Sequence, residues 1–108
     1  MPLRPVEFHI LLALASEERH GYGILQEVAG LTDGELELEP GTLYRALHRM
    51  LKDGWVAESS RRPAADLDDE RRRYYRLTPL GKRVATAEAD RLWRLVSVAR
   101  ANRLLSNG

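Results

Sequence analysis

The segment at residues 40–54, PGTLYRALHRMLKDG, constrains the fold of this chain more than any other part of the sequence. Four of its apolar side chains recur at the spacing of one face of an α-helix. They are Leu43, Leu47, Met50 and Leu51. We expect Thr42 to cap the start of this helix and Gly54 to close it. The helix would lie on a hydrophobic core with its opposite face open.

That opposite face carries cationic and aromatic side chains. They are Tyr44, Arg45, His48, Arg49 and Lys52. A helix that is apolar on one side and basic on the other has the size and charge needed to enter the major groove of double-stranded DNA. An amphipathic surface helix without any such role shows the same pattern, so other features of the chain must decide between the two interpretations.

The net charge of +1 hides an uneven distribution along the chain. Residues 1–39 hold two basic and eight acidic side chains. Residues 40–83 hold eleven basic and six acidic ones, and residues 84–108 hold four basic and two acidic ones. A basic middle indicates an anionic partner that meets this part of the molecule. Fifteen of the 17 basic residues are arginines, which suit phosphate and guanine contacts better than lysines do.

Composition excludes several classes of protein. A chain of 108 residues is expected to form a small core that an oligomer would help to stabilise. The absence of cysteine excludes disulfides and thiolate metal sites, and it fits a protein of the cytosol. No apolar run approaches the roughly 20 residues of a membrane span. The spacing of the histidines does not fit a metal site, so we expect no bound metal; they are His9, His20 and His48. The sequence has no phosphate loop and no nucleophile elbow, so we expect no cofactor and no enzymatic activity.

Two helices are expected before the basic helix, at residues 5–18 and 20–30. The buried face of the first is predicted at Val6, Ile10, Leu11, Leu14 and Ala15. The inward residues of the second are predicted to be Tyr22, Leu25, Val28 and Ala29. A turn should follow at residues 32–34. Residues 35–39, ELELE, alternate with the period of a strand and are expected to pair with a later strand.

After the basic helix, residues 55–60 and 73–78 are strand-like, and the segment between them has no periodicity, which predicts a hairpin with a long tip. Tyr74 and Tyr75 should face opposite sides of the second strand. Thr78 and Pro79 then begin a last helix that runs to about Leu105. The fold class is therefore mainly α with a small β-hairpin: a winged helix-turn-helix domain at residues 1–78, followed by a C-terminal dimerisation helix at residues 79–108.

The hairpin carries a second basic group. Its arginines lie at the two ends of the tip and converge if the strands pair: Arg61, Arg62, Arg71, Arg72 and Arg73. They could grip the DNA backbone or the minor groove. The alternative is a solvated loop whose own acidic residues, at positions 66 and 68–70, neutralise the arginines.

The last helix has an apolar seam with spacings of four, three, four and three residues, as in a coiled coil. The seam consists of Ala85, Ala89, Leu92, Val96 and Ala99, with Trp93 beside it. Because the domain can fill its core without this seam, we infer a homodimer. Its two basic helices could then read half-sites about 34 Å apart. The alternative is a helix that folds back on its own domain.

Three motifs in this order resemble the PadR-type bacterial transcriptional regulators, in the short form with a single C-terminal helix. They are HGYGI at residues 20–24, GTLYRALHRMLKDGW at residues 41–55 and RRYYRLTPLG at residues 72–81. The resemblance covers nearly the whole chain. It implies a dimeric winged-helix repressor in which the last helices form the dimer.

By motif match, the resemblance places Thr42, Tyr44 and Arg45 at the DNA-facing end of the recognition helix, and Arg72 and Arg73 at the wing. The sequence also departs from the family pattern. An acid is common where Gly23 stands, a proline where Arg45 stands and a glutamate where Leu51 stands. None of these departures conflicts with the fold, and Arg45 should strengthen contact with DNA.

The expected function is therefore sequence-specific binding of promoter DNA by a homodimeric regulator, most simply a repressor. Members similar to this chain often sense small, flat, hydrophobic or aromatic molecules. The resemblance implies such an effector here, and Trp93 is the residue that could stack on it, although Trp93 could equally pack the dimer. A different class remains open, a winged-helix module that binds another protein and never contacts DNA.

Overall fold

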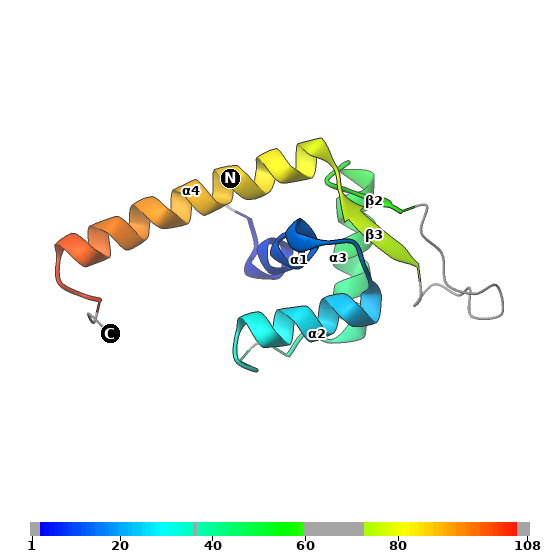
Figure 1. Cartoon of the computed structure of the whole chain (residues 1–108), viewed down its shortest axis with the longest axis horizontal. Helices are drawn as coiled ribbons and strands as arrows, with labels where there is room; N and C mark the ends of the chain where they lie inside the picture. Colours follow the sequence, from blue (N-terminus) through cyan, green and yellow to red (C-terminus); the bar gives the residue numbers. More distant parts are fainter. Residues whose placement is uncertain (1–2, 36, 60–72, 106–108) are drawn as a thin grey trace.

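A computed structural model of the chain describes residues 3–35, 37–59 and 73–105. Within them the fold is mainly α with a small antiparallel sheet, as the sequence predicted (Figure 1). The elements are α1 (Pro5–Ser16), β1 (Arg19–His20), α2 (Gly21–Leu31), α3 (Pro40–Lys52), β2 (Val56–Glu58), β3 (Tyr74–Leu77) and α4 (Pro79–Ala101). This is the element order of a winged helix-turn-helix followed by a long helix. No helix in the described part of the chain is both long enough and apolar enough to span a membrane.

The core lies between α1, α2, α3 and the sheet. Its buried side chains include Ile10, Leu11, Ala13, Leu14, Ile24, Val28, Leu43, Ala46, Leu47, Met50, Val56 and Tyr75. The prediction for α1 is partly wrong, because Ala13 is buried while Ala15 is exposed. Helix α1 contacts α2, α3, α4 and β3. Its buried arc is therefore wide, and Ala15 lies just beyond one edge of it.

The prediction for α2 is partly confirmed, because Val28 is buried and Ala29 is half-buried. Gly21, Ile24 and Val28 form its inner face, while Leu25 is only half-buried. Tyr22 is 62% exposed, so its expected inward position is wrong. The reason is geometric: Gly21 takes the inner position in the first turn, and the next residue is rotated by about 100° around the helix axis.

The sheet has the strand order β1-β3-β2, with both pairs antiparallel. In β1, Arg19 pairs with Tyr75 and His20 with Tyr74. The predicted pairing of residues 35–39 with a later strand is wrong: Glu35 and residues 37–39 form no strand, and residue 36 lies outside the described residues. The two-residue strand β1 pairs with β3 instead.

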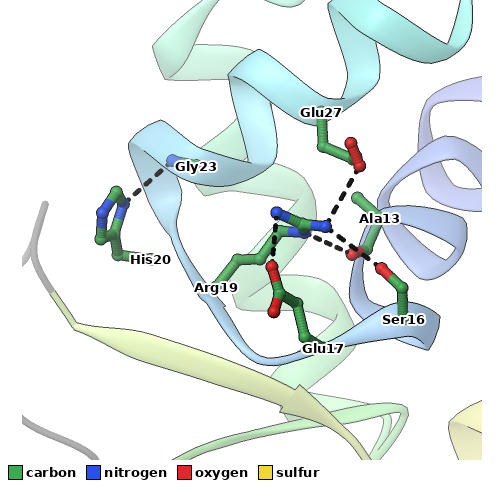
Figure 2. A network of polar contacts seen from close by, with 7 residues as sticks. All are labelled: Ala13, Ser16, Glu17, Arg19, His20, Gly23 and Glu27. Carbon is green, nitrogen blue, oxygen red and sulfur yellow. Dashed lines mark hydrogen bonds and ion pairs between the residues drawn. The ribbon is translucent and has the colours of Figure 1, made fainter.

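Arg19 joins α1 to α2 through a polar network (Figure 2). Its Nε donates to the carbonyl oxygen of Ala13 at 2.8 Å, and its Nη2 lies 3.1 Å from both Ser16 Oγ and Glu27 Oε2. Its Nη1 also pairs with Glu17 at 3.2 Å. A fork of guanidinium donors satisfies several acceptors at once, which fixes the angle between the two helices.

Helix α4 begins as the sequence predicted, with Thr78 at the N-cap and Pro79 in the first turn. Thr78 Oγ1 accepts from the Gly81 N–H at 3.0 Å and donates to the carbonyl oxygen of Gly54 at 2.5 Å. The Thr78 N–H donates to the carbonyl oxygen of Trp55 at 3.1 Å. The helix ends at Ala101, four residues before the expected end, because Arg103 takes a left-handed conformation with φ of 59°. Such a residue terminates a helix. In Figure 1, α4 runs from the root of the hairpin to the far end of the molecule.

Candidate nucleic-acid interface

Helix α3 has the two faces that its sequence predicts. Leu43, Leu47 and Met50 are fully buried, and Leu51 is half-buried against the core. The expected polar side chains are exposed on the other side: Arg45, His48, Arg49 and Lys52. Gly54 follows the helix with φ of 79°, as expected of a residue that closes a helix.

The start of α3 differs from the prediction. The helix begins at Pro40 with Glu39 at the N-cap, so Thr42 lies inside the first turn and is not the cap. A proline in the first turn needs no N–H partner, which lets the helix begin earlier than the threonine suggested. Thr42 Oγ1 instead accepts a hydrogen bond from Arg45 Nη2 at 3.3 Å. This contact holds the guanidinium along the exposed first turns of α3.

Arg49 lies in a different environment from Arg45. Its Nη2 is 3.9 Å from Glu7 Oε2 of α1. Both residues line a hollow of about 760 Å³ between the start of α1, the end of α3 and α4, together with Trp55 and Arg94. The structure therefore turns Arg49 toward α1, while Arg45 stays at the open end of the helix.

Tyr44 is half-buried, and its ring packs on the start of α2. A side chain at Gly21 would place its Cβ 2.9 Å from Tyr44 Cζ and 3.2 Å from Cε1. These distances are too short for carbon atoms, so a side chain at this position would displace the Tyr44 ring.

The hairpin lies beside the start of α2. Tyr75 is buried, while the Tyr74 ring meets the His20 ring edge-on at 5.3 Å, so the prediction that the two tyrosines face opposite sides is confirmed. Arg73 Nη1 pairs with Glu58 Oε1 at 3.2 Å across the two wing strands. The other wing arginines expected to contact DNA, Arg61, Arg62, Arg71 and Arg72, lie outside the described residues.

Helix α4 has two unlike halves. In the first half, Ala85 packs on the core of its own domain. Glu88 is 7% exposed, and its carboxylate accepts two hydrogen bonds from Arg91, at 2.8 and 2.7 Å. These hydrogen bonds from Arg91 lower the pKa of the Glu88 carboxyl, against the opposing effect of burial. Sequence reasoning missed this pair, since its only signal is the three-residue spacing on a helix.

The second half of α4 is open and apolar. Trp93 is 60% exposed, and Leu95 and Val98 are similarly open. The Arg100 guanidinium lies 5.7 Å from the centre of the Trp93 ring. Of the expected seam, Ala89 and Val96 are exposed and Leu92 and Ala99 are half-buried, whereas Ala85 is used by the domain itself. The seam available to a partner thus begins after the first two turns.

Metal ions in proteins are held by groups of ligating side chains that lie close together. Within residues 3–35, 37–59 and 73–105, no three histidine, aspartate or glutamate side chains are grouped as metal ligands would be.

The fold and the basic outer face of α3 define a class, the DNA-binding winged-helix proteins. The family model of the PadR-like transcriptional regulators matches residues 10–87. The chain belongs to this family, so it is a transcriptional regulator and not an enzyme.

Known relatives agree with this assignment. The chain is 37% identical over 83 residues to a transcriptional regulator of Mycobacterium tuberculosis, a match that covers 77% of this chain and 71% of the relative. Its fold is similar to that of a transcriptional regulator from Clostridium thermocellum, with a TM-score of 0.71, 27% identity and coverage of 94% and 90% of the two chains. The fold is also similar to that of Bacillus subtilis PadR, solved in complex with operator DNA, with a TM-score of 0.66, 21% identity and coverage of 82% and 47%.

Proposed function

We propose that the protein is a homodimeric repressor that binds operator DNA through α3 and the wing, in the cytoplasm of a bacterium. The observation that carries this proposal is the exposure of Arg45, His48 and Lys52 on a helix whose other face is fully buried. A rigid helix held by the core can enter the major groove and place these side chains on bases and phosphates. The similar Bacillus subtilis PadR was solved in complex with operator DNA, which supports DNA as the partner of this fold.

The proposed contacts fall into two groups. Arg45 and Thr42 lie at the start of α3, where they can reach base edges. The remaining contacts are to the backbone, from Tyr44, His48, Arg49, Lys52 and, on the wing, Arg61, Arg62, Arg72 and Arg73. We assign residues 1–78 to the DNA-binding domain and residues 79–108 to dimerisation.

The open apolar half of α4 supports a dimer. A helix of 23 residues extends about 35 Å, and its far half carries large apolar side chains exposed to water. A second copy that covers this face would remove them from water and set the distance between the two recognition helices. The proposed interface comprises Ala89, Leu92, Trp93, Val96 and Ala99, without Ala85, which packs on the core of its own domain.

A small hydrophobic or aromatic effector is proposed to bind at Trp93. The indole is exposed and lies beside the Arg100 guanidinium, so an aromatic ring could stack on it in place of the cation. Binding would release DNA if it changed the angle between the two copies.

The experiment that tests DNA binding is fluorescence anisotropy with DNA from upstream of the protein's own gene and a scrambled fragment, at several salt concentrations. Preferential binding with a steep negative salt dependence is expected. Arg45→Glu should abolish it, while Arg83→Glu, an equal charge change on the exposed side of α4, should leave most of it. Failure to bind even at low salt would favour the other candidate function, a winged-helix module for a protein partner, which the acidic first third of the chain would suit.

A further inference from the structure

Tyr22 is an exposed aromatic residue at the start of α2 that the proposed DNA contacts do not use. Its side chain is 62% exposed, while Gly21 before it is buried and Gly23 after it is half-buried. An isolated exposed aromatic side chain is common on protein surfaces and indicates nothing by itself. The position of Tyr22 relative to α3 and the wing is what makes it informative.

One neighbour of Tyr22 touches the recognition helix. Gly21 lies so close to the Tyr44 ring that an added Cβ would be 2.9 Å from Cζ. Tyr44 is adjacent in sequence to Arg45 and near Thr42, the two residues at the open end of α3. The first turn of α2 therefore rests directly on the part of α3 proposed to meet DNA.

The other side of the same turn touches the wing. His20 pairs with Tyr74 of β3, and the two rings meet edge-on at 5.3 Å. His20 Nδ1 also accepts from the Gly23 N–H at 2.9 Å, which caps α2 and fixes its first turn (Figure 2). Tyr22 thus lies on a turn that contacts both α3 and the wing, and its own side chain is open to solvent.

We infer that Tyr22 is a further DNA-contacting residue that donates a hydrogen bond from its hydroxyl to a backbone phosphate, and that Tyr44, besides its proposed backbone contact, is a spacer that sets α2 on α3. The inference rests on the proposed function. A duplex that meets both α3 and the wing passes over the start of α2. A tyrosine hydroxyl is a common donor to phosphate oxygens, and such a contact sets the position of the protein on the duplex without reading its sequence.

The first test is Tyr22→Phe, which removes one hydroxyl and keeps the ring. Affinity for the promoter fragment and for the scrambled fragment should both fall about 3- to 10-fold, the effect of one hydrogen bond. The salt dependence should not change, because a neutral donor releases no counterion. The urea midpoint should also stay the same, since the hydroxyl is on an exposed side chain.

The outcomes separate the inference from the proposed function. If the unmodified protein binds the promoter fragment and Tyr22→Phe binds equally well, the inference is wrong and the proposed function stands. If the unmodified protein binds neither fragment, both are wrong. Arg45→Glu provides the contrast, because loss of a cation must change the salt dependence.

The spacer role of Tyr44 is tested by a double-mutant cycle with Gly21. Gly21→Ala should lower both the urea midpoint and the promoter affinity, because the new methyl group displaces the Tyr44 ring. Adding Tyr44→Leu should restore part of the midpoint, since the smaller side chain makes room. Strictly additive losses would overturn the spacer role. Gly30→Ala, at a helical glycine with no atom within 4 Å of an added Cβ, is the matched control.

Discussion

Arg49 of α3 lies opposite Glu7 of α1, with 3.9 Å between Nη2 and Oε2. Glu7 is further held by the Arg4 N–H, which donates to Oε1 at 3.1 Å, so the carboxylate is fixed at the start of α1. The two arginines of α3 therefore have different roles in a single copy of the protein. Arg45 is at the open end of the helix, and the charge of Arg49 is partly compensated from within the domain.

This difference predicts unequal effects of two alanine substitutions. Arg45→Ala should weaken promoter binding about 10-fold or more and reduce the slope of log affinity against log salt by about 1. Arg49→Ala should weaken binding less, and should lower the free energy of unfolding by about 1 kcal/mol or less, since its ion pair is partly exposed. Anisotropy and urea unfolding of both variants check this. A larger loss of affinity in Arg49→Ala would show that Arg49 leaves Glu7 when DNA binds.

The apolar half of α4 predicts a dimer that a single charge should break. Val96→Glu places a carboxylate in the proposed seam, where burial of an unpaired charge is costly. We expect a predominantly monomeric protein at micromolar concentration by sedimentation velocity, and a loss of promoter affinity. Ala87→Glu is the matched control, because it adds the same carboxylate at an exposed position on the opposite side of α4 from Val96. If the unmodified protein sediments as a monomer, the dimer proposal is wrong.

Glu88 and Arg91 predict a specific dependence of stability on pH. The pKa of Glu88 is lowered in the folded state below its ordinary value of 4.5, chiefly by the hydrogen bonds from Arg91. A carboxylate with a lowered folded-state pKa contributes stability above its unfolded pKa, and this contribution is lost as the pH falls through the folded value. Between pH 7 and about pH 3, the unfolding temperature of Glu88→Gln should thus fall less steeply than that of the unmodified protein. Parallel curves would contradict the role of this pair.

Two glycines should respond to alanine in opposite ways. At Gly81, an added Cβ would lie 2.8 Å from the carbonyl carbon of Trp55 and still closer to its oxygen. Because backbone cannot yield easily, Gly81→Ala should destabilise the protein by about 2 kcal/mol or more. Gly30→Ala meets open space within α2 and should stabilise it by about 0.5–1 kcal/mol. Urea unfolding measures both, and equal effects would show that the contact at Gly81 is not restrictive.

The sequence predicted those elements whose residues carry their own signal. The spacing of Leu43, Leu47 and Met50 is enough to orient α3, because one buried stripe fixes the whole helix. Thr78 followed by Pro79 locates the start of α4 for a similar local reason.

The features that were missed depend on contacts between distant residues. Arg19–His20 is too short to show a period, and it is a strand only because β3 lies beside it. Residues 35–39 have the period of a strand, but both sides of β3 are taken, by β1 and β2, and Glu35 and residues 37–39 form no strand. The outward position of Tyr22 follows from the approach of the Tyr44 ring to Gly21, which neither local sequence reveals. Likewise, nothing in the spacing of Arg49 indicates Glu7 as its partner.

The contacts at Thr78 hold the start of α4 rigidly against the root of the hairpin. Since the Trp55 carbonyl oxygen accepts from Thr78 and Gly81 leaves no space beside it, the helix cannot swing independently of the hairpin root. Over an arm of about 35 Å, a tilt of about 10° displaces one end by about 6 Å relative to the other. That displacement approaches two base-pair steps of about 3.4 Å each. In the proposed dimer, a modest repacking around Trp93 would therefore be amplified enough to put the two recognition helices out of phase with their half-sites.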